Sequence, residues 1–150
     1  MAIGTKISFL TAQAMGQAIT AALDAGSAGA VIEIRTGTPP VTVEEASTGT
    51  LLAVLTCSVA SFDAGVDQSP GCLFTSAAIT DEGSALANGT AGYFVAGSSN
   101  AADTILDKVI LGTAGEASDD ADMTLDNKVI AITGTVGVAL GGWTFTMAEG

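Results

Sequence analysis

The hydrophobic period of the chain changes at Gly26, and this change limits the folds that the sequence can adopt. From Thr11 to Ala25 the apolar residues recur at spacings of three and four, which predicts one helix over residues 11–25. We expect Thr11 to cap the first turn and Gly26 to end the helix with a left-handed backbone. After Gly26 the period becomes two, which is typical of half-buried strands.

The predicted helix has an apolar face and a polar face. We expect the apolar face to lie on the body of the protein; its members are Ala12, Met15, Ile19, Ala22 and Leu23. The opposite face is polar and holds Gln13, Gln17, Thr20 and Asp24. The sequence therefore predicts an amphipathic helix that rests on a larger structure.

The rest of the chain consists of short strand patterns separated by turn residues. The predicted strands cover residues 30–35, 51–58, 72–80, 90–96, 104–111, 123–125 and 127–133, and a last one in which Trp143, Phe145 and Met147 share a face. This pattern predicts a mainly β fold, a β-sandwich or jelly-roll-like domain with one N-terminal amphipathic helix. We expect one domain over residues 11–150, preceded by an arm of residues 1–10.

The arm is rich in large apolar side chains for so short a segment. Ile3, Ile7, Phe9 and Leu10 have nothing within the arm to bury them. Two interpretations are open: the arm pairs with a neighbouring chain by strand addition or hydrophobic docking, or it forms the first strand of the same sandwich. On the first interpretation these four residues bind a partner.

The charge balance excludes several classes of function. Sixteen Asp and Glu stand against four Lys and Arg, the formal net charge is -12, and there is no histidine. Four scattered cations cannot form the basic stripe that nucleic-acid binding requires. Without histidine, His-dependent triads and His-rich zinc sites are also excluded. We therefore predict no catalytic residue, no cofactor and no metal, and expect a structural or binding protein.

The acidic residues of the second half gather in one segment. They are Glu116, Asp119, Asp120, Asp122 and Asp126. Close carboxylates could hold calcium, but the glycine and the closing glutamate of an EF-hand are missing at their required offsets, and a solvated acidic loop explains them as well. Cys57 and Cys72 match no metal-ligand spacing and are predicted to be buried thiols, although a disulfide between neighbouring strands stays open.

Two segments share some features with membrane or targeting signals. The N-terminal residues are interrupted by polar side chains and lack the apolar centre of a signal peptide. Residues 129–148 are twenty uncharged residues, enough for a membrane-spanning helix, yet they are rich in glycine and threonine. We expect two buried strands around a glycine turn there and no membrane partner. Tyr93 and Trp143 are expected in the core, with anchoring of a partner as the alternative.

The order of motifs in the first half resembles a known group of proteins. Residues 30–40 read AVIEIRTGTPP and residues 48–58 read TGTLLAVLTCS. A helix, an I-x-I-x-T-G-x-x-P strand and a T-G-T-L-L-A-x-L segment in this order resemble small virion proteins of tailed bacteriophages. The similarity covers chiefly residues 11–80 and is looser towards the C-terminus. The two cysteines depart from the commoner form.

The resemblance implies a structural protein of the virion, of the capsid decoration (cement) type. Its partner would be the major capsid protein, which it would bind as a homo-oligomer, such as a trimer, to stabilise the head. Packaged DNA would repel a chain of charge -12, so the outer capsid surface is the expected location. The alternatives are a tail, baseplate or fibre-associated virion protein and, third, an extracellular adhesin or carbohydrate-binding module.

Overall fold

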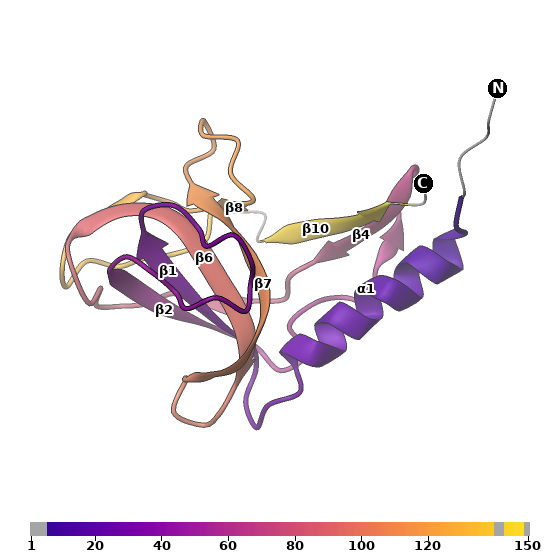
Figure 1. Cartoon of the computed structure of the whole chain (residues 1–150), viewed down its shortest axis with the longest axis horizontal. Helices are drawn as coiled ribbons and strands as arrows, with labels where there is room; N and C mark the ends of the chain where they lie inside the picture. The colour runs from indigo at the N-terminus through magenta and orange to yellow at the C-terminus, as the bar shows by residue number, and fades with distance from the viewer. Residues whose placement is uncertain (1–5, 140–142, 149–150) are drawn as a thin grey trace.

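The computed structural model describes residues 6–139 and 143–148 and shows a mainly β protein with one helix near its N-terminus (Figure 1). The elements are, in chain order, α1 (Phe9–Leu23), β1 (Val31–Thr36), β2 (Leu51–Cys57), β3 (Val66–Asp67), β4 (Gly71–Thr75), β5 (Ile79–Thr80), β6 (Gly89–Ser99), β7 (Ile105–Gly115), β8 (Met123–Thr124), β9 (Val129–Ile130) and β10 (Thr144–Ala148). The predicted fold class, a β-sandwich-like domain with an N-terminal helix, is confirmed.

The larger of two sheets is built around β6. Its strand order is β5-β2-β1-β6-β7-β8, and β9 also pairs with β6. β1 pairs antiparallel with both β2 and β6, so Ile32 lies opposite Leu55 on one side and Ala96 on the other. Ile34 lies opposite Phe94 on β6, on the same face as Ile32. These buried side chains form the face of the large sheet that carries the core.

The other face of the large sheet is covered by the connection between β1 and β2, which crosses in front of β6 and β7 in Figure 1. The buried Tyr93 hydroxyl donates a hydrogen bond to the carbonyl of Thr48. Lys108 Nζ donates to the carbonyl of Glu45 at 2.6 Å. These two bonds hold the connection, residues 37–50, over strands that would otherwise expose apolar side chains.

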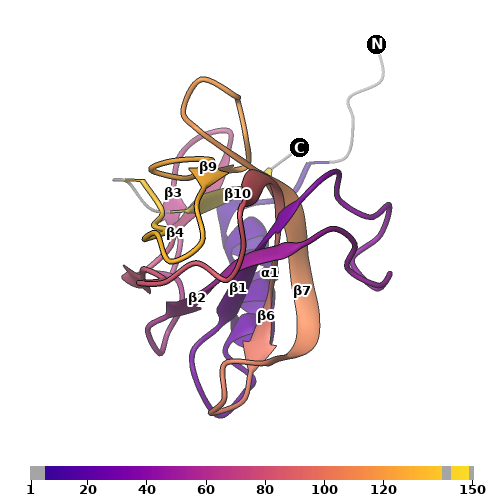
Figure 2. The same cartoon turned by 90° about the vertical axis from the view of Figure 1, so that its left-hand side faces the viewer.

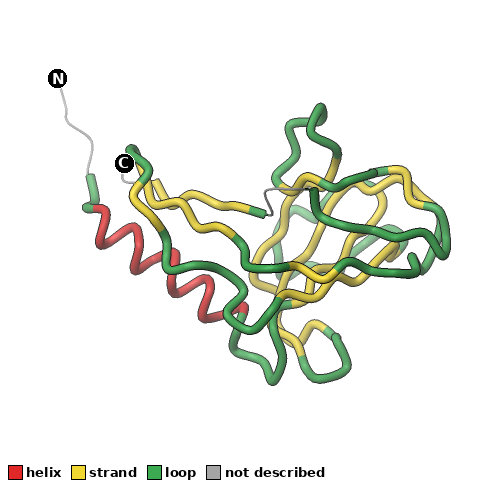
Figure 3. Tube along the Cα trace, turned by 180° about the vertical axis from the view of Figure 1, so that it is seen from behind, coloured by secondary structure: helices red, strands yellow, loops and turns green. Residues whose placement is uncertain are grey.

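The smaller sheet has three strands in the order β10-β4-β3, and α1 lies along it (Figures 1 and 3). Figure 2, viewed from the side of the large sheet, shows α1 behind β1 and β6. Gly16 lies against the ring of Phe74 on β4: a Cβ built on Gly16 would be 2.1 Å from Phe74 Cε2. Only a residue without a side chain allows this close approach of the helix to the sheet.

A chain of aromatic rings connects the two sheets. Phe74 of β4 stacks on Phe145 of β10 at 4.9 Å between ring centroids, and Phe62 packs edge-on against Phe145 at 5.1 Å. Phe62 also meets Trp143 at 4.9 Å, and Trp143 meets Phe94 of β6 at 5.0 Å, both edge-on. Edge-to-face and offset pairs at these distances are favourable, so five rings join the small sheet to the core of the large one.

The predicted ends of the helix need correction. The helix begins at Phe9, and its cap is Ser8, whose Oγ accepts a hydrogen bond from the backbone N–H of Thr11. Its C-cap is Asp24, two residues before Gly26. Ser8, and not Thr11, is the cap because Phe9 and Leu10, an apolar pair directly after Ser8, continue the helix towards the N-terminus.

The predicted faces of the helix also need correction. Gln13 and Gln17 do not point away from the protein: their side-chain amides donate to the carbonyl of Ala64 at 3.0 and 3.2 Å. Met15, predicted to be inward, is 48% exposed. The loop between β2 and β3 offers carbonyl groups to the glutamines, which turns the helix away from the orientation that hydrophobicity alone favours.

Several predicted strands are shorter or divided. The strand predicted over 72–80 is split into β4 and β5, which belong to different sheets, and β3 lies between the strands predicted over 51–58 and 72–80. The strand predicted over 127–133 is only Val129–Ile130. Segment 129–148 does hold strands β9 and β10, but they pair with β6 and β4 and not with each other. Within the described part of the chain, no helix combines the length and apolarity needed to cross a bilayer.

Candidate functional site

The four residues predicted to bind a partner do not form one extended arm. Phe9 and Leu10 are the first residues of α1, which rules out a strand there. Ile7 and Phe9 are partly buried and pack against the core, whereas Leu10 is 71% exposed. Ile3 lies outside the described residues. The described end of the predicted arm, residues 7–10, thus belongs to the folded body, and Leu10 is part of the helix surface.

The acidic segment is folded by its own carboxylates. Asp119 accepts the backbone N–H of Glu116 at 2.8 Å and forms an ion pair with Lys128 at 2.7 Å. Asp122 Oδ2 accepts both the N–H and the hydroxyl of Thr113, at 2.8 and 2.7 Å. Over residues 6–139 and 143–148, no group of three or more acidic or cysteine side chains is placed to hold a metal ion.

The ion pair shifts the pKa values of both side chains so that their charged forms are favoured. The hydrogen bond from Lys128 lowers the pKa of the Asp119 carboxyl, and that same bond raises the pKa of Lys128. Both side chains are at the surface, so the pair orders the loop between β7 and β9 without building a buried site.

A buried polar cluster lies where α1 meets the large sheet. Asp24 accepts the hydroxyl of Ser61 at 2.6 Å, and Ser61 Oγ accepts the N–H of Ala30 at 3.2 Å. Cys57 of β2 lies beside them, and burial, with the nearby charge of Asp24, raises the pKa of its thiol to about 11. A thiol that is protonated at neutral pH is a poor nucleophile, so this cluster is structural. Cys57 and Cys72 are both buried and form no disulfide with each other.

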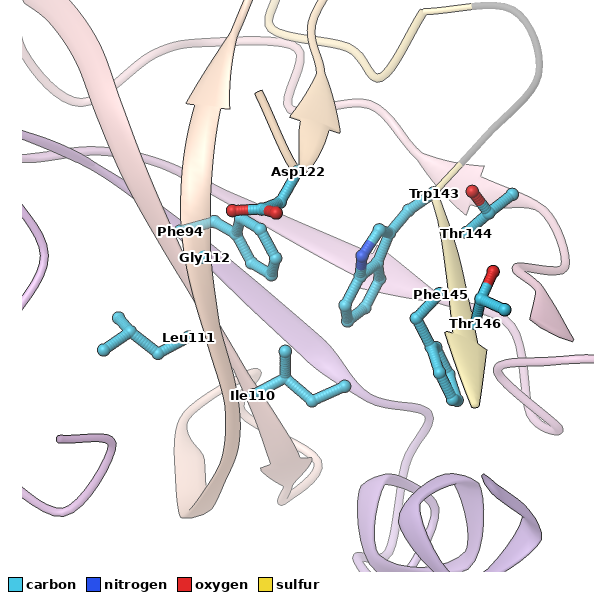
Figure 4. A pocket seen from close by; sticks show the side chains of 9 residues that line it. All are labelled: Phe94, Ile110, Leu111, Gly112, Asp122, Trp143, Thr144, Phe145 and Thr146. Carbon is cyan, nitrogen blue, oxygen red and sulfur yellow. The ribbon is translucent and has the colours of Figure 1, made fainter. Parts of the chain in front are cut away.

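A cleft lies between the two sheets, where β7 of the large sheet faces β10 of the small one (Figure 4). Its volume is about 380 Å³, within the range of ligand sites. It is lined by 110–112 of β7, by 143–146 at β10, by Phe94 of β6 and by Asp122. We call this site the β7–β10 cleft.

The cleft runs along the edges of two strands. Successive side chains of a strand point to opposite faces, so a site on one face is lined by every second residue. Three consecutive residues of β7 and four consecutive residues at β10 line this one. Among the described residues, β10 pairs only with β4, and β7 pairs outside β6 only at Ala114 and Gly115. Both strands therefore present unpaired edges to the cleft.

Trp143 provides the most specific polar group of the cleft. Its ring is 2% exposed, and its backbone is held by Ser76: Trp143 N donates to Ser76 Oγ at 2.9 Å. Among residues 6–139 and 143–148, no atom accepts a hydrogen bond from the indole N–H of Trp143. In the same part of the chain, every fully buried polar side-chain atom has a hydrogen-bond partner, so the indole nitrogen is not fully buried. The Nε1 atom is therefore open to the cleft, and Figure 4 shows it turned towards the side where Phe94 and Asp122 lie.

The solvent-facing side of α1 is a second notable surface. Its exposed residues that make no contact with the loop after β2 are Leu10, Thr11, Ala14, Met15, Ala18, Ala21 and Ala22, and we call them the outer face of α1. No residue of the helix is charged, although the chain carries sixteen carboxylates. Surface helices normally present charged residues to water, so this face is suited to contact with another protein.

Sequence reasoning missed the cleft because its residues are far apart in the chain. Trp143 was expected in the core, and it is 2% exposed there, but it also lines the cleft. Tyr93 is fully buried and cannot anchor a partner. The available signal was the alternation of Trp143, Phe145 and Met147, but alternation does not reveal which edge of a strand stays unpaired.

Comparison of the chain with protein families, with curated proteins and with solved structures finds no match in any of the three.

Proposed function

We propose that this protein is a virion structural protein of a tailed bacteriophage, a capsid decoration protein that binds the major capsid protein on the outside of the head. The observation that carries the proposal is the outer face of α1, an uncharged surface on a chain of net charge -12. Protein interfaces are depleted in charge at their centre, because charges must lose water on binding.

The choice of partner rests on the resemblance of residues 11–80 to small virion proteins. The net charge of -12 favours a location on the outer surface of the head, because the packaged DNA inside would repel the sixteen carboxylates. A decoration protein acts in many copies, so a modest contact per copy is enough to reinforce a shell. The two exposed large residues of the face, Leu10 and Met15, are the expected centre of the contact.

The test is localisation within particles of the virus whose genome encodes the chain. Heads and tails are separated, and the chain is quantified in each by mass spectrometry. A copy number that matches the capsid lattice supports the proposal. A few copies confined to tails would replace it with the tail, baseplate or fibre role, and glycan binding without any association with particles would favour an adhesin.

A pair of variants then tests the surface. Leu10→Asp places a carboxylate on the outer face of α1 and should sharply reduce the copies bound to heads that lack the protein. Val59→Asp is the matched control, because Val59 is an apolar residue in the loop after β2 that is 82% exposed, against 71% for Leu10. Equal binding by both variants would contradict the assignment of the helix face.

A further inference from the structure

We infer that the β7–β10 cleft binds an extended segment of a second copy of this chain, residues 1–6, as an added strand. This inference goes beyond the proposed function and concerns contacts between copies of the chain, not contacts with the head. It starts from the two unpaired strand edges, which need backbone partners, and from the open indole N–H of Trp143, which needs an acceptor.

The chemistry of the cleft favours a peptide over a sugar. Sugars are held by aromatic rings with an accessible face and by several polar groups, but Phe94 is fully buried and Trp143 nearly so. What reaches the cleft is the indole N–H, apolar side chains such as Ile110, and the edges of β7 and β10. A strand supplies backbone carbonyl and N–H groups for the edges, a carbonyl for Trp143 Nε1, and side chains for the apolar floor.

The sequence of residues 1–6, MAIGTK, has the pattern of such a strand. Met1, Ile3 and Thr5 fall on one side at period two, and small residues with Lys6 fall on the other. A β-branched residue at position 3 suits a pleated, half-buried environment. Placed in the cleft, the first side would lie on the apolar floor.

Charge complementarity supports this segment as the occupant. Lys6 is the only charged residue among the first 23, and the remaining 127 hold all sixteen carboxylates against three cations. Lys6 is exposed and forms no ion pair within the described ranges. Asp122 at the rim of the cleft offers it a carboxylate. A cationic segment that enters an acidic body is attracted, whereas most pairs of surfaces on two such chains repel each other.

The direction of α1 favours binding of the segment by a second copy over binding within one chain. α1 begins near the far end of the small sheet and runs back towards the large sheet (Figure 1). The cleft lies beside the large sheet, because Trp143 packs against Phe94 of β6 there. A 15-residue helix is about 22 Å long. Six extended residues span at most about 20 Å. A segment of this length that ran back along the helix would leave no residues to lie in the cleft. Binding in trans, repeated around a ring, would give a closed homo-oligomer.

The experiment uses the full chain, whose only tryptophan is Trp143. Assembly is followed by analytical ultracentrifugation, and occupation of the cleft by Trp143 fluorescence, as the concentration is raised. We expect assembly and a change in tryptophan emission to occur together. A chain that stays monomeric, or that assembles without any change in emission, would overturn the inference.

Three variants locate the contact. Ile3→Asp should remain folded by circular dichroism but lose assembly, and Trp143→Phe, which keeps a ring and removes the N–H, should weaken assembly by about 2- to 10-fold. Leu10→Asp is the matched control and should assemble like the native chain, even though it is expected to bind heads poorly. Loss of assembly in Leu10→Asp with none in Ile3→Asp would move the contact to the helix and overturn the inference.

A peptide probe separates the alternatives for the occupant. A synthetic peptide of residues 1–8, MAIGTKIS, added to the full-length Ile3→Asp chain should restore the change in Trp143 emission. The same peptide with aspartate at its third position should not. A response to a panel of saccharides, with none to the peptide, would make the cleft a glycan site and overturn the inference. Since no head is present, failure here leaves the proposed function standing.

Discussion

The two sheets of this protein are stabilised in different ways. In the large sheet, β6 pairs with β1 and β7 over most of its eleven residues, and the backbone ladder is long on both sides. In the small sheet, β4 and β10 share five residue pairs and β3 adds two, so the stability there comes from the aromatic chain and from α1 packed on Phe74. A short sheet is only marginally stable unless one of its faces is packed. The small sheet is therefore stabilised mainly by side-chain packing, and the large sheet mainly by the backbone hydrogen bonds between its strands.

The difference places the surfaces proposed for binding. The helix that carries the outer face of α1 packs on the small sheet, and the β7–β10 cleft lies where the two sheets meet. Regions with fewer ladder bonds open at lower free energy than the global unfolding of a domain. The region expected to contact partners is thus also the one expected to open first.

The largest expected effect comes from Phe74→Ala. Removing a fully buried ring should lower the free energy of unfolding by about 3–5 kcal/mol. Hydrogen exchange should accelerate in α1, β4 and β10 and much less in β6 and β7. Phe94→Ala, the matched change in the large sheet, should accelerate exchange in β6 and β7. Identical exchange patterns in the two variants would show that the sheets unfold as one unit.

The second prediction concerns Cys57, at the joint between α1 and the large sheet. Its raised pKa, about 11 from an ordinary 9.0, means that the folded state favours the protonated thiol. This contribution is fully present below pH 9 and is lost as the pH rises through 11. Over that window the native chain should lose about 2–3 kcal/mol more stability than Cys57→Ala. Urea unfolding at pH 8, 9, 10 and 11 measures the difference, and parallel curves would refute the shift.

Gly16→Ala tests the contact between helix and small sheet. Alanine favours a helix by about 1 kcal/mol over glycine, so propensity alone predicts stabilisation. The new Cβ, however, would lie 2.1 Å from the Phe74 ring, and we expect a net loss of about 1–3 kcal/mol. Gly83→Ala is the control, because a Cβ at Gly83 meets nothing within 4 Å. A stabilised Gly16→Ala protein would mean that Phe74 moves aside freely.

The smallest effect is expected for Asp119→Asn, at the surface of the loop between β7 and β9. The lowered pKa of Asp119 means that its ion pair stabilises the fold above the ordinary carboxyl pKa of 3.8, and that this is lost as the pH falls through the still lower folded value. Melting temperatures of native and variant chains should differ slightly at pH 7, less at high salt, and converge in strong acid. A gap that persists in acid would point to the backbone hydrogen bond of Glu116 as its source.

The sequence by itself determined the elements whose pattern is local. The 3.6 period before Gly26 identified the helix within two residues at each end, and the alternation in residues 30–35 and 143–147 identified the strands β1 and β10. The charge of -12 and the lack of histidine are also read directly from the sequence, and the expectation of a structural or binding protein rests on them. Such features depend on neighbouring residues, so periodicity and composition are enough to read them.

Only the tertiary structure decided which surfaces meet. Gln13 and Gln17 face the protein because the carbonyl of Ala64, about fifty residues away, accepts their hydrogen bonds. β9 and β10 lie in different sheets because each pairs with a distant strand, and the unpaired edges of β7 and β10 follow from that pairing. The free energy of each long-range contact depends on which other contacts form, and no local pattern contains that information.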